Sequence, residues 1–379
     1  MTKAAMYFHH LHFYVRDVAF WRDWFICKLC FEAVAAASAA HEVLVQGAIE
    51  IRLSEGSKDS ENSEDSEAAT YLHKHPPGLV DVGLATDCFE ATLQRAIAAG
   101  ATLVTPVSIN DQGQRECQIQ GWADLRHTLV EVSPVWVAAH LAGHQNTGHQ
   151  NTGHQNTGHQ NTGHRHIEDW LCAVDHVVLN VPQGELAAAV DWYQAVFGLV
   201  RGQHFDITTA HSGLRSQVLM HPEGTLQMPI NEPTSANSQI QEFLNHNRGA
   251  GIQHVALRSE QATRAIAHFR QRGLDLISVP TTYYDGLHQR PDCPIPNTSA
   301  ASRQQLLLDW APGGQQGMLL QTFTKPIFSE PTFFFEIIER SLYQEAGQTK
   351  RAQGFGEGNF QALFEAIERA QAARGGVFN

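Results

Sequence analysis

The chain has 379 residues, more than one hydrophobic core usually organises, so its length predicts two domains. Hydrophobic residues make up 42% and charged residues 17%, as in ordinary globular proteins. The formal net charge of -13 excludes a protein that binds nucleic acid or an anionic membrane surface through a general positive field. No run of eighteen apolar residues could cross a membrane, and the start of the chain is typical of a strand rather than a secretory signal.

The first predicted unit, residues 9–34 (HHLHFYVRDVAFWRDWFICKLCFEAV), is a strand, a short turn and an amphipathic helix. Its helix contains the close cysteine pair Cys27 and Cys30. A redox or zinc motif would need a second pair or an exposed turn, so we favour two cysteines at the end of an apolar helix. The six scattered cysteines are typical of a reducing compartment, and we expect a cytoplasmic protein.

Two segments are predicted to be unstructured. Residues 54–69 (SEGSKDSENSEDSEAA) are acidic and serine-rich, with no large apolar side chain to pack. Residues 143–164 repeat GHQNT, which spaces histidines five apart and aligns them on neither a helix face nor a strand face. We favour a linker over a metal-binding tract for this repeat. The predicted domains are therefore residues 1–142 and 168–379, joined by a linker over 143–167.

The two sides of the linker resemble each other. The matched segments are 9–34 with 174–200, 78–101 with 251–274, and 126–134 with 331–340. In the second copy one helical face carries Leu186, Val190, Tyr193 and Phe197 and ends at Gly198. Because each half repeats strand–helix–strand units, we expect internal duplication and an α+β fold with mixed, mostly antiparallel sheets.

Three candidate metal ligands lie in predicted strands of the second half, roughly eighty residues apart: His176, His254 and Glu336. Two neutral imidazoles and one carboxylate on one face leave three open positions on iron(II), as an oxygenase requires. A single buried histidine is more often a hydrogen-bonded core residue. The carboxylate of Glu336 is flanked by Phe and Ile and needs a metal or an ion pair, with Arg340 as the alternative partner. Strand alternation places Phe334 on the same face as Glu336.

The sequence pattern predicts His10, Asp81 and Glu131 as the corresponding residues of the first half. They could form a second metal site. We favour a copy without catalytic function, because Asp81 replaces the second histidine.

Six segments in the second half carry a family resemblance: SGLRSQVL, MPINEP, SQIQEFLNHNRGAGIQHVAL, LLQTFTKPIF, FFFEIIER and GFGEGNFQALFEAIE. In this order they resemble the 4-hydroxyphenylpyruvate dioxygenase family of the vicinal oxygen chelate superfamily. The resemblance implies two open β-barrel domains, each built from paired βαβββ modules. It implies one Fe(II) per chain in the C-terminal barrel, held by His176, His254 and Glu336, and we expect a homo-oligomer.

The implied reaction converts 4-hydroxyphenylpyruvate, an aromatic α-keto acid, and O2 to homogentisate and CO2 by oxidative decarboxylation, ring hydroxylation and side-chain migration. The resemblance also implies these substrate-binding residues: Ser216, Asn231, Gln239, Gln253, Phe323, Phe334, Phe355, Asn359 and Phe360. Regular alternation would point Gln253 away from His254, so either the strand is irregular there or Gln253 acts indirectly. A last helix over 359–373 is expected to close the barrel mouth.

Three alternatives remain open. The first is 4-hydroxymandelate synthase, which shares substrate and ligands; Pro229 and Phe360 favour the dioxygenase. The second is a non-catalytic protein of the same fold that binds an aromatic ligand. The third is an extradiol ring-cleaving enzyme, which would need a histidine acid/base near the metal. The candidates for that role are His204, His211, His221 and His288.

Overall fold

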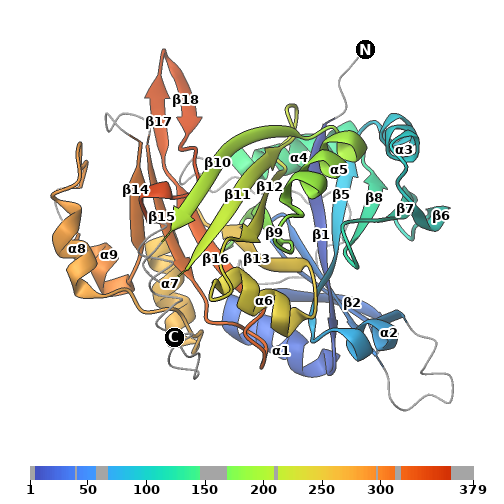
Figure 1. Cartoon of the computed structure of the whole chain (residues 1–379), viewed down its shortest axis with the longest axis horizontal. Helices are drawn as coiled ribbons and strands as arrows, with labels where there is room; N and C mark the ends of the chain where they lie inside the picture. Colours follow the sequence, from blue (N-terminus) through green and yellow to red (C-terminus); the bar gives the residue numbers. More distant parts are fainter. Residues whose placement is uncertain are drawn as a thin grey trace, which may run out of the picture.

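A computed structural model describes residues 5–38, 41–56, 67–145, 169–208, 212–295, 298–311 and 317–359. Within these residues the chain forms two eight-stranded mixed sheets and one two-stranded hairpin (Figure 1). No helix among them is long and apolar enough to span a membrane. The expected α+β fold is confirmed.

The first sheet has the strand order β2-β3-β4-β1-β5-β8-β7-β6. The elements of this half are β1 (Met6–Val15), α1 (Val18–Leu29), β2 (Glu32–Ser38), β3 (His41–Gln46), β4 (Ile49–Glu55), α2 (Glu67–Lys74), β5 (Gly78–Thr86), α3 (Phe89–Ala98), β6 (Leu103–Ile109), β7 (Arg115–Gln120), β8 (Arg126–Glu131) and α4 (Pro134–Gln145).

The second sheet has the strand order β10-β11-β12-β9-β13-β16-β15-β14. The elements of this half are β9 (Ala173–Asn180), α5 (Leu186–Phe197), β10 (Val200–Thr208), β11 (Gly213–Met220), β12 (Gln227–Pro233), α6 (Gln239–Asn247), β13 (Gly251–Arg258), α7 (Ala262–Gln271), α8 (Thr281–Leu287), α9 (Ser299–Gln304), β14 (Leu307–Trp310), β15 (Met318–Phe323), β16 (Phe334–Arg340), β17 (Leu342–Glu345), β18 (Gln348–Arg351) and the 3-10 turn η2 (Glu357–Asn359).

The two sheets repeat one plan. Adding eight to each strand number of the first sheet reproduces the order of the second. Each half contains two βαβββ modules, whose first strands, β1 with β5 and β9 with β13, pair antiparallel at the sheet centre. The first and last strands of each module run parallel where they pair. The predicted internal duplication is therefore present at the level of individual strands.

Both sheets are also interrupted at equivalent places. In β1 the pairing register with β5 shifts between Phe8 and His10, which leaves His9 as an extra residue. In β9 the register with β13 shifts around Asp175, the residue at the same position. A β-bulge of this kind turns two consecutive side chains toward one side of the strand. The duplication therefore includes local irregularities that determine which side chains meet.

The helices end as their sequences predict. The α1 helix begins after Asp17, whose carboxylate accepts a hydrogen bond from the Phe20 amide, and ends at Cys30 in the left-handed conformation, with φ of 62°. Cys27 and Cys30 are both unbridged thiols at this helix end. The predicted face of α5 is buried, and Gly198 ends that helix with φ of 71°.

One hydrophobic core joins the two halves. The ring of Phe13 on β1 meets Phe333 edge to face at 5.1 Å between centroids, and Phe25 on α1 contacts Phe335 at 5.9 Å. These contacts link the N-terminal module to the strand that carries Glu336. The first half therefore supports the wall of the site described below.

Two segments predicted to be unstructured are ordered at their ends. Ser54 belongs to β4 and its hydroxyl bonds the rings of His12 and His41, while α2 begins at Glu67. Residues 143–145 complete α4, because the helix continues into the first repeat. The remainder of the GHQNT repeat and the expected last helix from residue 360 onward lie outside the described residues.

Candidate metal centre

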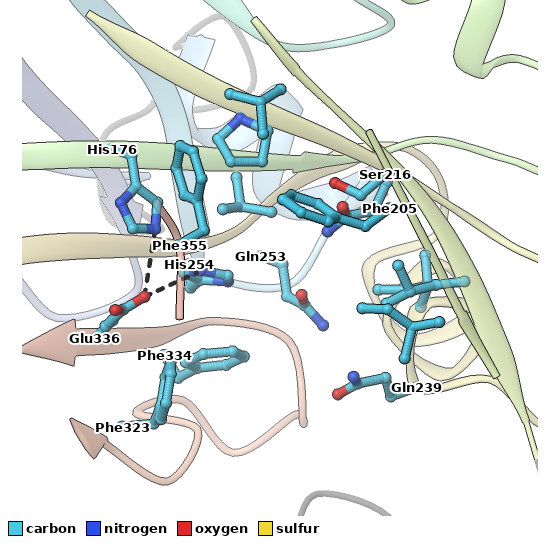
Figure 2. A pocket seen from close by; sticks show the side chains of 17 residues that line it. His176, Phe205, Ser216, Gln239, Gln253, His254, Phe323, Phe334, Glu336 and Phe355 are labelled. Carbon is cyan, nitrogen blue, oxygen red and sulfur yellow. Dashed lines mark ion pairs between the residues drawn. The ribbon is translucent and has the colours of Figure 1, made fainter. Parts of the chain in front are cut away.

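His176, His254 and Glu336 come together at the centre of the second sheet. The ligand atoms of the three side chains all lie within 4.8 Å of one another. The nearest carboxylate oxygen of Glu336, Oε2, is 3.3 Å from His176 Nε2 and 3.7 Å from His254 Nε2 (Figure 2). Neighbouring ligands about 2.1 Å from one ion and at right angles are ~3 Å apart, so one cation fits between them after small shifts.

The sheet register explains why these three residues meet. Strand β13 runs parallel to β16, with His254 opposite Phe334 and Ala256 opposite Glu336. Strand β9 runs antiparallel to β13, with His176 opposite Ala256. Because alternate residues of a strand share a face, the three ligands occupy neighbouring positions on one face of three adjacent strands. The triad predicted from the sequence is therefore assembled by regular backbone structure.

The ion pair of Asp175 with Arg340 lies behind His176 and holds the orientation of its ring. Asp175 Oδ1 accepts a hydrogen bond of 2.9 Å from His176 Nδ1, and this leaves Nε2 to face Glu336. Burial disfavours a charged His176, but the carboxylates of Glu336 and Asp175 outweigh it and raise its pKa to about 9. Arg340 binds Asp175 through two bonds of 2.7 Å, so the alternative pairing of Arg340 with Glu336 is not formed. Burial opposes the charged form of Asp175, yet Arg340 holds its pKa well below the usual range.

His254 has the environment of a neutral metal ligand. Its ring stacks on Phe334 with centroids 4.8 Å apart and planes 15° apart. Burial, with a smaller effect of His176, lowers the pKa of His254 well below its usual value. Its Nδ1 atom is buried and has no hydrogen-bond partner in the part of the chain that the structure describes. One buried and one partly buried imidazole with Nε2 aimed at a buried carboxylate are a donor set that fits a divalent transition metal.

Gln321 on β15 is a member of this site that sequence reasoning missed. Its Nε2 donates to Glu336 Oε1 at 2.9 Å and to the carbonyl of Phe355 at 3.0 Å. Its Oε1 accepts a bond of 3.2 Å from Asn359 Nδ2. Gln321 therefore orients the carboxylate and ties it to the segment that follows β18. Only the motif LLQTFTKPIF could have indicated it, because nothing in the strand itself marks Gln321 as a contact of Glu336.

A cavity opens from the metal triad and is lined mainly by apolar side chains. Of the expected substrate residues, the lining includes Ser216, Asn231, Gln239, Gln253, Phe323, Phe334 and Phe355. Figure 2 shows Ser216 and Gln239 at the end of the cavity away from Glu336. Asn359 does not line the cavity; it bonds Gln321 and the hydroxyl of Tyr283. Phe360 lies outside the described residues.

A bulge resolves the orientation of Gln253. The register between β13 and β9 shifts between Ile252 and His254, which leaves Gln253 as the extra residue. The two consecutive side chains Gln253 and His254 can therefore both face the cavity, and both line it (Figure 2). Of the two explanations offered by the sequence, the irregular strand is the one found.

The rest of the lining was not anticipated from the sequence. The additional side chains are Val178, Phe205, Ile207, Leu214, Val218 and Ile240. They come from β9, β10, β11 and α6, whose apolar residues look like any core face in one sequence. Pro229, one of the two residues that favour the dioxygenase over the synthase, also lines the cavity.

The candidates for a first-half copy of the triad do not form one. By strand pairing, Asp81 and Gly83 correspond to His254 and Ala256, and Leu129 lies opposite Leu84, so Thr128 corresponds to Glu336. Glu131 was the wrong choice, because it lies three residues further along β8 and pairs with Arg115 at 2.8 Å. Asp81 accepts bonds from the backbone and side chain of Thr128 instead of facing a metal.

Three of the four candidate acid/base histidines of an extradiol enzyme lie in the described residues, and these three do not line the cavity. None of His204, His221 and His288 lines it, and His204 instead pairs with Asp206 on an exposed strand. His211 lies outside the described residues. The described part of the site therefore provides no histidine, beyond the two ligands, for that chemistry.

The class of protein to which this chain belongs can be identified by comparing its duplicated βαβββ modules and its His–His–Glu centre with known proteins. The family model of the Glyoxalase/Bleomycin resistance protein/Dioxygenase superfamily matches residues 173–290, which include both histidine ligands. A solved structure of a 4-hydroxymandelate synthase variant from Streptomyces coelicolor has the same fold, with a TM-score of 0.75 and 22% identity, covering 97% of this chain and 100% of that one.

Curated relatives narrow the class to one family. The chain is 32% identical to a 4-hydroxyphenylpyruvate dioxygenase of Caenorhabditis briggsae over 98% of this chain and 93% of that protein. It is 30% identical to that of Danio rerio over 98% of this chain and 92% of that protein. The chain belongs to the 4-hydroxyphenylpyruvate dioxygenase family.

Proposed function

We propose that this protein converts 4-hydroxyphenylpyruvate and O2 to homogentisate and CO2 with one Fe(II) per chain. The observation that carries the proposal is a His–His–Glu triad, in which His176 and Glu336 are buried and His254 is partly buried, at one end of a mainly apolar cavity whose other end holds Ser216 and Gln239. This polarity suits a substrate with a charged α-keto acid at one end and a phenol at the other.

Fe(II) would be held by His176, His254 and Glu336, which share one face of three adjacent strands. When bound, the metal supplies the redox chemistry and a fixed point for the α-keto acid and O2. The protein residues orient the ligands: Asp175 fixes the ring of His176, and Gln321 fixes the carboxylate of Glu336.

The cavity positions the aromatic part of the substrate. Phe334 stacks on His254 and Phe355 meets the ring of His176 at 5.1 Å, so both rings flank the space next to the triad. The buried Oε1 of Gln239 has no partner within the described chain and can accept a hydrogen bond from the hydroxyl of a phenol. Gln253 reaches the space between these two ends from the bulge in β13 (Figure 2).

The remaining role of the protein is to exclude water from the cavity and so limit side reactions. The reaction needs no net proton from a side chain, since the atoms of substrate and O2 equal those of homogentisate and CO2. One oxygen atom enters the new carboxylate and one enters the ring. The mostly apolar lining excludes water that would compete for the open face of the metal.

The test is anaerobic loading of the full-length protein with Fe(II), followed by O2 uptake and product identification with 4-hydroxyphenylpyruvate. We expect homogentisate from the wild type and none from Glu336→Ala. A matched control is Glu345→Ala, which removes an exposed carboxylate on β17. Homogentisate and 4-hydroxymandelate are isomers, so the products must be separated by chromatography rather than by mass.

Each outcome is decisive. 4-Hydroxymandelate as the product would keep the metal site but overturn the proposed ring hydroxylation. Iron-loaded protein that takes up no O2 with this substrate would overturn the substrate assignment. Tight binding of the substrate by a protein that retains no iron would favour the non-catalytic ligand-binding alternative.

Further sequence-based predictions accompany this function. We propose a homo-oligomer, a cytoplasmic location, and domains over 1–142 and 168–379 with a linker over 143–167. Light scattering on the purified chain tests the first, localisation of a tagged chain the second, and limited proteolysis within the GHQNT repeat the third.

A further inference from the structure

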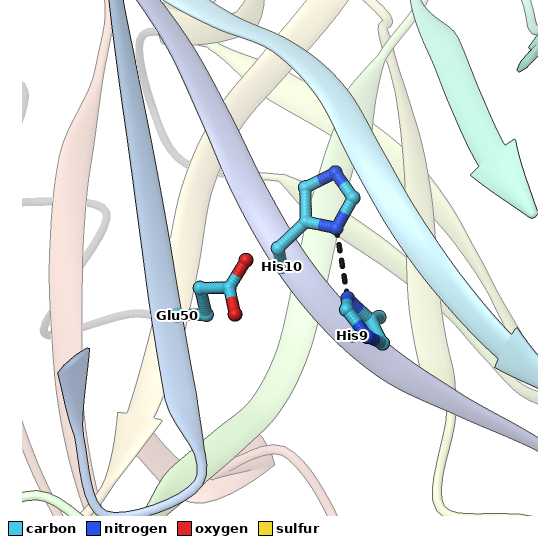
Figure 3. A group of neighbouring side chains, drawn as sticks. All are labelled: His9, His10 and Glu50. Carbon is cyan, nitrogen blue, oxygen red and sulfur yellow. Dashed lines mark hydrogen bonds between the residues drawn. The ribbon is translucent and has the colours of Figure 1, made fainter. Parts of the chain in front are cut away.

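A second cluster of metal-ligand side chains lies in the first half, formed by His9, His10 and Glu50. One ligand atom from each lies within 4.8 Å of the others. The two histidines are consecutive residues of β1, and Glu50 lies on the parallel neighbour β4 (Figure 3). We propose that these residues bind a second divalent transition-metal ion of the zinc type, separate from the catalytic centre.

The bulge in β1 creates this cluster. Consecutive residues of a regular strand point to opposite faces, so two adjacent histidines of such a strand could not bind the same metal ion. Because His9 is the extra residue between Phe8 and His10, the two rings come together instead. Their Nδ1 atoms lie 3.0 Å apart, with the rings nearly perpendicular at 89° (Figure 3).

This distance suits two ligands of one ion. Two imidazole nitrogens bound to tetrahedral zinc at about 2.05 Å lie ~3.3 Å apart, so a shift of a few tenths of an ångström admits the metal. In the metal-free pair one Nδ1 donates and the other accepts, so the accepting ring is neutral and its lone pair already points into the space between the two nitrogens. A metal ion replaces that single hydrogen bond with two bonds to nitrogen.

Glu50 supplies the carboxylate ligand, and its partial exposure gives a metal ion access from solvent. The pairing of Leu11 with Ile51 brings Glu50 alongside His10. Arg52 Nε donates to one oxygen of Glu50 at 2.7 Å, which leaves the second oxygen for a metal. The Glu50 side chain is 21% exposed, so an ion can enter from solvent and keep a water as its fourth ligand. The charge of Arg52 opposes a cation, so we expect weaker binding here than at the catalytic triad.

The surroundings hold the histidines in place. The ring of Trp136 on α4 stacks on His9 at 5.8 Å between centroids. His10 is 2% exposed, and its Nε2 has no partner among the described residues. Burying an imidazole with an unsatisfied nitrogen costs free energy. A bond from the other ring nitrogen to a metal ion would offset that cost.

This cluster is not a remnant of the catalytic triad. His10 occupies the position of His176, but the residues at the positions of His254 and Glu336, Asp81 and Thr128, bond each other. Glu50 comes from β4, on the side of β1 opposite β5. The proposed site therefore uses a different neighbour of the same strand, and none of its three ligands lines the substrate cavity.

The test is a metal count by equilibrium dialysis of the metal-free, full-length protein against Zn²⁺. Four proteins are compared: the wild type, His10→Asn, Glu50→Gln and the control His41→Asn, an exposed histidine of the same sheet. All four contain the catalytic triad and the GHQNT histidines, so metal bound there cancels in the comparison. Co²⁺ provides a second readout through the visible absorption of a low-coordinate site.

We expect the wild type and His41→Asn to bind one more equivalent than His10→Asn and Glu50→Gln, and to show a Co²⁺ absorption that the two variants lack. Dioxygenase activity of the iron-loaded variants is expected to be unchanged. Equal counts and equal spectra in all four proteins would overturn the proposal. If His10→Asn does not fold, Glu50→Gln alone decides, because Glu50 is partly exposed.

Discussion

Asp175 and Arg340 form a buried two-bond ion pair directly behind His176, one of the three candidate metal ligands. Both bonds measure 2.7 Å, and both side chains are 4% exposed. Arg340 also donates to the carbonyls of Ala352 and Gly354, so it connects β9, β16 and the segment after β18. The strands that carry His176 and Glu336 are therefore linked to the segment after β18 through the side chain of Arg340.

Breaking this pair is expected to damage both stability and metal binding. Arg340→Met leaves the carboxylate of Asp175 buried and uncompensated, which costs about 3–5 kcal/mol of unfolding free energy. The freed Asp175 also orients His176 less well, so Fe(II) affinity falls roughly 10–100-fold. Urea unfolding and iron titration measure the two effects.

The double variant Asp175→Asn/Arg340→Met is the matched control for that charge argument. Removing both charges should recover part of the lost stability. If the double variant were less stable than Arg340→Met by the full cost of Asp175→Asn measured alone, the two residues would not act as a pair.

Gln321→Leu is expected to weaken metal binding without abolishing it. The substitution removes the 2.9 Å hydrogen bond to Glu336 Oε1 and the link to Asn359. Loss of such an orienting contact typically lowers metal affinity about 10–100-fold. Iron retention during dialysis against a competing chelator measures the effect, with the exposed Gln344→Leu on β17 as the control. Unchanged retention would mean that Glu336 is held by its strand alone.

Gln253→Ala is expected to affect the substrate and spare the metal. Gln253 lines the cavity from the bulge but bonds none of the three ligands. Loss of one substrate hydrogen bond of about 1 kcal/mol raises KM roughly fivefold while iron content stays constant. Steady-state kinetics with parallel iron analysis tests this, with Gln241→Ala on the exposed side of α6 as the control. A loss of iron would instead make Gln253 part of the metal centre.

The sequence predicted what depends on regular structure. Strand alternation correctly placed Phe334 beside Glu336, and the three candidate ligands, which do lie together, could be selected because each lies in a separate, recognisable strand. The orientation of Gln253 could not be decided, because a bulge is a property of the pairing between two strands. Glu131 was misplaced for the same reason: aligning hydrophobic patterns does not fix register to within three residues.

Contacts between residues of distant strands also could not be predicted from the sequence. Gln321 and Arg340 each reach their partner across the sheet, over separations of 15 and 165 residues. No local pattern in either strand distinguishes them from solvent-facing polar residues. The choice of Arg340 between Glu336 and Asp175 likewise depended on which face each strand presents.

Buried neutral histidines are expected to make the protein sensitive to acid. His127 bonds Tyr193 at 2.9 Å across the interface of the two halves and also contacts the carbonyl of Val82. Burial lowers the pKa of His127 below its ordinary value, so the native state holds it neutral while the unfolded chain protonates near pH 6.5. Its contribution to stability is therefore present above pH 6.5 and is lost as pH falls toward the native pKa.

The variant His127→Asn isolates that contribution. One group that protonates only in the unfolded chain changes the unfolding free energy by up to about 1.4 kcal/mol per pH unit, so the variant should lose less stability than the wild type between pH 6.5 and 5. Urea unfolding of the metal-free proteins at several pH values measures the two slopes. His12 and His221, each with a pKa lowered to about 4 mainly by burial, remain in both proteins and contribute equally. Parallel slopes would show that His127 takes up its proton without unfolding, and that the contact with Tyr193 tolerates a charged ring.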